Sequence, residues 1–307
     1  MYITLYKQVK SLSYKIYKIL QAGPESYTKP LQPTTNEHIV PKHVVQEFTT
    51  RKPFYIFVTQ TDKIIEKKNT KEVCTRSNEY EMRDVNKKII FQNLIERDFL
   101  AKVEGMLTTP YRKIIEVARK QNNIKTFLRS SNNRYAIMLW MSLITLRSPA
   151  NIPMFAQACE DVGIVFKEKD KRNAGLSILV NVLPEFAKQS MDIYNIIVLR
   201  NNTTLPFVLS SRPAILRLII QKATNETQYV WTCPIAEDLM LLLIDKEHSL
   251  GADGAVLEIS INEVDNYNRL LFQDRTVEQF ICTQKSALKR YHKVWQGRKV
   301  KKIKEKS

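Results

Sequence analysis

Twelve consecutive residues, YAIMLWMSLITL at positions 135–146, are apolar on most sides when they are drawn as a helix. A helix needs about 20 such residues to cross a bilayer, so this run is too short for a membrane span. It also lacks the polar face that a surface helix turns to water. We therefore expect a buried core helix that ends at Arg147, before Ser148 and Pro149.

Strand-like segments stand on both sides of this helical middle. Residues 38–48, bent at Pro41, and residues 53–59 are rich in β-branched and aromatic side chains, which favours strands. From about residue 190 the apolar pattern shifts toward a period of two. Five further strands are predicted there, over residues 193–200, 205–210, 228–235, 239–245 and 255–261. Strands, then helices, then antiparallel strands indicate an α+β fold.

The helical middle also contains one clear amphipathic stripe. Ile95, Phe99, Val103 and Met106 recur at intervals of three and four, and Pro110 follows where the helix bends or restarts. Two further helices are predicted, over residues 151–163 and 262–275.

The net charge of +17 is concentrated at the two ends of the chain. Residues 289–307 carry nine Lys or Arg against one Glu, and residues 1–30 carry five Lys against one Glu. We read residues 1–20 as a basic amphipathic helix. The predicted organisation is an N-terminal extension and linker over 1–30, one α+β domain over 31–288, and a basic helical tail over 289–307.

Composition excludes several classes of protein. The chain has only 7 Gly and no glycine-rich phosphate-binding motif. Its 4 Cys stand far apart without a CxxC pair, which indicates separate reduced thiols and a cytoplasmic protein. Lysines interrupt the apolar positions at the N-terminus, so no secretory signal peptide is expected.

Six segments in order are similar to a family of bacterial and fungal proteins known only as a domain of unknown function. They are HIVPKHVVQEF, IERDFLAKVEG, LRSP, FVLSSRPA, CPIAEDLML and NEVDNYNRLL, and they span roughly residues 36–285. The first resembles the family's opening His-x-Val-Pro motif. The resemblance implies an α+β domain and supplies no chemistry.

The chain departs from the family pattern at two places. Val44 and Val45 stand where the family has Tyr-Leu, which is a change in packing. Ser211 stands where the family has the Asp of a Ser-Asp-Asn-Pro stretch. If that carboxylate is catalytic in relatives, this chain lacks the group.

Four residues are candidates for catalysis. His38 could serve as a general base or metal ligand, because the pKa of an imidazole is near neutrality. Glu96 and Glu104 would supply carboxylates for a divalent metal, and Arg147 would hold a phosphate. Together they would form a metal-dependent phosphodiesterase or nuclease. In a regular α-helix Glu96 and Glu104 lie about 80° apart around the axis, so the pair alone would not chelate one ion.

Each of these residues also has a structural interpretation, which we favour. His38 would pin the N-terminal strand to the helical core, and Arg147 would pair with Glu96 or Glu104. His43 lies five residues from His38, on the opposite face of a straight strand, so a joint metal site depends on the bend at Pro41.

Other polar residues in the resembling segments are weaker candidates. Ser210 and Ser211 lack the Gly-x-Ser-x-Gly context of a nucleophile. Asn268 is expected to be a turn or network residue.

The basic tail is the most direct indication of a partner. Tyr291 and Trp295 are one helical turn apart among basic residues, a pattern that can neutralise phosphates and stack on bases. The predicted nucleic-acid contacts are Lys289, Arg290, Lys293, Trp295, Arg298, Lys299, Lys301 and Lys302. The alternative is a solvated end that contributes only solubility. Peripheral contact of both ends with an anionic membrane is a third hypothesis.

Overall fold

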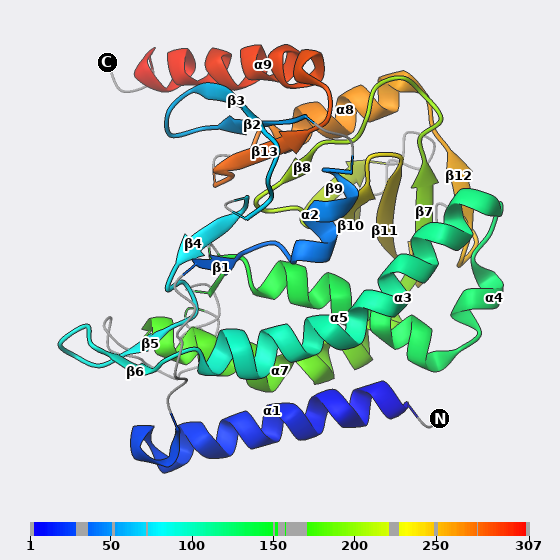
Figure 1. Ribbon diagram of the computed structural model, residues 1–307. Helices are drawn as coiled ribbons and strands as arrows, with labels where there is room; N and C mark the ends of the chain where they lie inside the picture. The colour runs from blue at the N-terminus through cyan, green and yellow to red at the C-terminus, as the bar shows by residue number, and fades with distance from the viewer. Residues whose placement is uncertain are drawn as a thin grey trace. The chain divides into compact units, whose positions relative to one another are not determined.

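The computed structural model describes residues 3–28, 36–50, 53–71, 73–149, 151–152, 157, 171–220, 227–248, 251–274 and 276–304 (Figure 1). The chain forms two compact units, each assembled from three separate stretches of sequence. Unit 1 comprises Met1–Ile39, Thr75–Ile114 and Thr126–Tyr194, and unit 2 comprises Val40–Cys74, Ile115–Lys125 and Asn195–Ser307. The predicted domain boundaries at residues 30 and 288 stay predictions.

Unit 1 is mainly helical. Its helices are α1 (Thr4–Ala22), a short 3-10 turn η1 (Pro24–Ser26), a π-helix η2 (Glu96–Leu100), the first part of α3 (Ala101–Lys120), most of α4 (Lys125–Leu128), α5 (Ser131–Leu146) and α7 (Lys171–Ile193). The described part of unit 1 also contains two small antiparallel pairs: β1 (Asn36–His38) with β4 (Thr75–Ser77), and β5 (Met82–Arg83) with β6 (Ile89–Phe91).

Helix α5 is the predicted core helix. The side chain of Ser130 caps its first turn by accepting the N–H of Asn133, and Arg147 is its C-cap, as predicted. All of its residues from Tyr135 onward except Thr145 are buried. Helices α1 and α7 pack against it, as they do against one another (Figure 1). In α1, Val9, Ser13 and Ile16 form the buried stripe.

Unit 2 contains most of the strands. Its short helices are α2 (Lys42–Glu47), η4 (Lys246–His248) and α8 (Ile261–Leu271), and its last is α9 (Lys285–Lys304). One sheet has the order β12-β7-β11-β10-β9, over Val256–Glu258, Tyr194–Arg200, Leu239–Asp245, Thr227–Ala236 and Ile215–Ile220. The other has the order β3-β2-β13-β8, over Lys63–Lys67, Phe54–Val58, Gln279–Cys282 and Leu209–Ser210.

Helix α9 lies along the four-stranded sheet and contacts β2, β3 and β13 (Figure 1). The aromatic rings of Phe57, Phe272 and Phe280 stack beneath it, with centroids 3.8 to 6.1 Å apart. Helix α8 begins with a capping box, in which Ser260 and Glu263 each accept a backbone N–H of the other.

The α+β prediction is confirmed, with four local corrections. Residues 42–47 form a helix rather than a continuation of the first strand. Strand β12 pairs with β7 in parallel, within a set predicted to be antiparallel. The polar stretch 60–86, whose sequence predicts a loop with one short strand, contains three strands. Helix α3 continues through Pro110.

Some predictions fall partly or wholly outside the described residues, notably the helix over 151–163 and Cys159. Cys74, Cys233 and Cys282 are buried free thiols. Among the described helices, none is long and apolar enough to cross a membrane.

Candidate functional site

Arg147, at the end of α5, is the centre of a charged cluster in unit 1. Its side chain has no exposed surface. It forms an ion pair with Glu104 and a second one with Glu96, where the nitrogen lies 3.6 Å from the carboxylate oxygen. Burial alone would lower the pKa of Arg147, but Tyr80 and these two carboxylates raise it above its ordinary value. The guanidinium is therefore a permanent buried cation. The sequence predicts pairing with Glu96 or Glu104, and the structure shows an ion pair with each.

The same guanidinium links the end of α5 to two other segments of the chain, at His38 and at Tyr80. It donates a hydrogen bond to the carbonyl oxygen of His38 in β1. It also donates to the hydroxyl of Tyr80 at 3.2 Å, and that hydroxyl donates to the carbonyl of Arg147 at 3.1 Å. Arg147 therefore contacts the backbone of His38 and not its half-buried imidazole. The first strand is thus joined to α5 through the backbone of His38. A bond from the His38 imidazole stays a prediction.

The π-helix explains why two glutamates eight residues apart reach one guanidinium. Residues 96–100 form its wider turn, directly before α3. In a regular α-helix the two side chains would lie about 80° apart around the axis. The stripe of buried residues shifts as well: Leu107 is buried, whereas Met106 is partly exposed.

Two further carboxyl groups lie fully buried in the same unit. Glu37 accepts the backbone N–H of Tyr80 at 2.8 Å, and Glu81 accepts the backbone N–H of Asn93 at 2.8 Å. Burial raises the pKa of Glu37 to about 8, and the charge of Glu96 adds to this effect. Burial likewise raises the pKa of Glu96 to about 7 against the opposing charge of Arg147. The pKa values of Glu37 and Glu96 are therefore both raised toward the neutral range.

The carboxylates of this cluster contact Arg147. Within the described part of the chain, no group of three or more His, Cys, Asp or Glu side chains is placed to hold a metal ion. Glu96 and Glu104 direct their oxygens to Arg147, which supplies the positive charge that a cation would otherwise provide.

The serine pair and Asn268 bond to nearby backbone in unit 2. The hydroxyl of Ser210 donates to the carbonyl of Arg212, and the hydroxyl of Ser211 accepts the N–H of Glu278 at 3.0 Å. Asn268 bonds to the backbone of Pro206 and Val208, as a network residue would. These side chains therefore hold the backbone of the turns around them in place.

In α9 the aromatic residues of the tail face the domain. Tyr291 is fully buried and its hydroxyl donates to Asp265 at 2.9 Å. The half-buried ring of Trp295 packs edge-on against Phe57, with centroids 5.2 Å apart. The expectation that these rings are displayed for stacking on bases is therefore wrong for Tyr291, and Trp295 already has an aromatic partner.

The basic residues of α9 have a different arrangement. Lys289 and Lys293 are exposed and lie one turn apart on its outer face, whereas Arg290 pairs with Asp265 at 2.9 Å. The helix then continues to Lys304, through a segment whose side chains lie outside the described part. That segment contains Arg298, Lys299, Lys301 and Lys302.

The family model with the description "Protein of unknown function (DUF4238)" matches residues 36–286. The chain belongs to this family. The DUF4238 match includes the whole Arg147 cluster and stops at the first turn of α9, so Lys289 and Lys293 lie beyond it. Comparison with curated proteins and with solved structures finds no match.

Proposed function

We propose that this protein is a binding protein that engages nucleic acid or another polyanion through α9 and the residues that follow it. The observation that supports this most is the outward position of Lys289 and Lys293 at the beginning of a segment with nine Lys or Arg and one Glu. Such a surface gains affinity by releasing counterions from phosphates. Because Tyr291 and Trp295 pack inward, the expected contact is electrostatic and independent of base sequence.

Replacement of the two exposed lysines tests this proposal. Lys289→Ala/Lys293→Ala is compared with Lys63→Ala/Lys68→Ala, a matched pair of exposed lysines on and beside β3 in the same unit. Fluorescence anisotropy with a labelled single-stranded 20-mer of DNA or RNA measures the affinity. We expect at least fivefold weaker binding for the α9 pair and less than twofold for the β3 pair. Equal losses would show a general effect of net charge and would reject α9 as the site.

One observation favours a second candidate function, a phosphodiesterase that uses His38, Glu96, Glu104 and Arg147 with a divalent metal. The pKa of Glu96, raised to about 7, suits a group that transfers protons at neutral pH. This proposal predicts cleavage of labelled DNA or RNA with Mg²⁺ or Mn²⁺ and none with chelator. It also predicts that Glu96→Gln and His38→Ala lose cleavage while they keep the wild-type circular dichroism spectrum. Cleavage that survives in both folded variants would reject it.

A further inference from the structure

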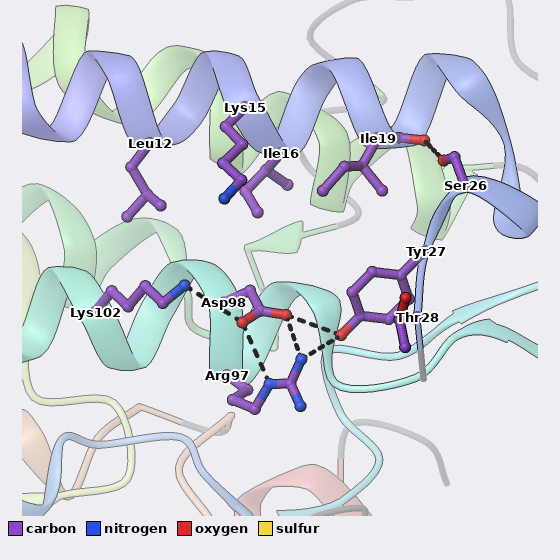
Figure 2. A pocket seen from close by; sticks show the side chains of 10 residues that line it. All are labelled: Leu12, Lys15, Ile16, Ile19, Ser26, Tyr27, Thr28, Arg97, Asp98 and Lys102. Atoms are coloured by element: carbon purple, nitrogen blue, oxygen red, sulfur yellow. Dashed lines mark hydrogen bonds and ion pairs between the residues drawn. The ribbon is translucent and has the colours of Figure 1, made fainter. Parts of the chain in front are cut away.

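A pocket in unit 1 lies between α1 and the π-helix with the start of α3 (Figure 2). Its volume is about 280 Å³, close to the lower end of the range of small-molecule sites, which is roughly 300–1,000 Å³. The lining residues are Leu12, Lys15, Ile16, Ile19, Ser26, Tyr27, Thr28, Arg97, Asp98 and Lys102. None of them belongs to the Arg147 cluster.

One side of the pocket is apolar. Leu12, Ile16 and Ile19 project from α1 toward the π-helix, as Figure 2 shows. Ile16 is buried, and Leu12 and Ile19 are half-buried. These three side chains offer a surface for a short aliphatic chain.

The opposite side carries a fixed network around Asp98. This carboxylate accepts hydrogen bonds from Arg97 at 2.7 Å and from the hydroxyl of Tyr27 at 2.9 Å, and Lys102 lies 3.4 Å away. Burial alone would raise the pKa of Asp98, but the bonds from Arg97 and Tyr27 lower it, so the group is ionised. One negative charge is therefore shared by two cations.

Lys15 adds a third cation from α1. Its side chain points into the space between the two helices (Figure 2). In the part of the chain that the structure describes, its ammonium group has no hydrogen-bond or ion-pair partner. The lining thus holds three cations and one carboxylate. This surplus of positive charge lies beside the apolar side chains of α1.

We infer that this pocket binds a small soluble amphiphilic anion, with its acidic headgroup at Lys15, Arg97 and Lys102 and a short aliphatic chain against Leu12, Ile16 and Ile19. The acidic headgroup neutralises the surplus positive charge, and a volume of about 280 Å³ limits the aliphatic chain to about the length of an octyl group. This inference is independent of the polyanion site, because none of its residues lies in α9.

Isothermal titration calorimetry with octyl phosphate below its micelle concentration tests the inference. Inorganic phosphate serves as the headgroup alone. Burial of each methylene is worth about fourfold in affinity, so we expect octyl phosphate to bind one site at least tenfold more tightly than phosphate. An absence of saturable octyl phosphate binding, or equal affinities for the two ligands, would overturn the inference.

Lys15→Glu and Lys18→Glu form a matched pair of variants. Both residues are exposed on α1, but only Lys15 lines the pocket. Reversal of a charge near the headgroup should weaken octyl phosphate binding about tenfold in Lys15→Glu and by less than twofold in Lys18→Glu. Both should keep the wild-type melting temperature, because neither side chain is buried. Equal losses would overturn the assigned site.

Two controls separate the possible sources of the headgroup. Lys289→Ala/Lys293→Ala should bind octyl phosphate like the wild type, and a loss there would place the site on α9. Vesicles of phosphatidylcholine with phosphatidic acid present the same phosphate monoester on a membrane. Binding to vesicles that Lys15→Glu abolishes, without binding of free octyl phosphate, would overturn the assignment to a soluble ligand.

Discussion

The Arg147 cluster and the outer face of α9 use the same kind of side chain for opposite purposes. Arg147 is fully buried and its nitrogens contact two carboxylates, a carbonyl and a hydroxyl. Lys289 and Lys293 are exposed on a helix whose inner face is occupied by Tyr291 and Trp295. A buried cation with complete contacts fixes the fold, whereas an exposed one is available to a partner. The comparison predicts where substitution should affect stability and where it should affect binding.

The largest expected effect is at Arg147. Arg147→Met removes the charge that balances Glu96 and Glu104 in a buried site, and it leaves the His38 carbonyl without this donor. The free energy of unfolding should fall by about 3–5 kcal/mol. Urea denaturation measures it. Arg290→Met, whose ion pair with Asp265 is half-exposed, is the control and should lose less than about 1 kcal/mol. Similar losses of stability in the two variants would contradict the distinction between a buried and an exposed cation.

The next largest effect is the pH dependence that Glu37 gives to the free energy of unfolding. Its pKa rises from 4.5 in the unfolded chain to about 8 in the fold, so the folded state holds the proton more tightly. Its stabilising contribution is complete below pH 4.5 and is lost as pH rises through 8. Glu37→Gln cannot ionise, so its stability relative to the wild type should increase by about 3–4 kcal/mol between pH 5 and pH 8.

Urea denaturation of both proteins at each pH unit gives this difference. Glu116→Gln, at an exposed residue paired with Lys120 at 3.0 Å, provides the control. Its stability should follow the wild-type curve. If the Glu37→Gln and wild-type curves also run in parallel, then Glu37 is ionised in the fold and the account of its burial is wrong.

A smaller loss of stability is expected at Trp295. Trp295→Ala removes the contact with Phe57 beneath α9, and we expect a loss of about 1–2 kcal/mol because the ring is only half-buried. Thermal unfolding followed by circular dichroism measures it. A variant with unchanged stability and weaker nucleic-acid binding would instead show that the indole serves a partner.

The smallest effect on stability is expected for the exposed lysines. Lys289→Ala/Lys293→Ala should change the free energy of unfolding by less than about 0.5 kcal/mol. Urea denaturation under the conditions used for Arg147→Met makes the two directly comparable. A loss of more than 1 kcal/mol would mean that these lysines also support the fold.

The parts of the fold that were predictable are those that depend on local pattern. The apolar run of α5 and the β-branched and aromatic residues of β2 and β10 indicate their elements without tertiary information. Residues 42–47 contain the β-branched pair Val44-Val45, which favours a strand, but they form a helix in which this pair is buried. There tertiary packing overrides local propensity.

The residues of the Arg147 cluster were predictable from the sequence, but their geometry was not. The pairing of Arg147 with Glu96 and Glu104 followed from a charge at the end of an apolar helix. Nothing in the sequence marks the π-helix that brings both glutamates to it. The sequence does not indicate the pocket beside Lys15 either. Its two sides come from residues 12–28 and 97–102, which only the fold brings together.

The central claim is that α9 and its continuation bind polyanions electrostatically, and the salt dependence of binding tests it most directly. Affinity for a single-stranded 20-mer is measured from 50 to 300 mM KCl for the full chain and for a chain that ends at Gly297, which keeps Tyr291 and Trp295. The truncation removes six Lys or Arg and one Glu. The slope of log affinity against log salt should become shallower by about 3–4. Identical slopes for the two chains would contradict the claim.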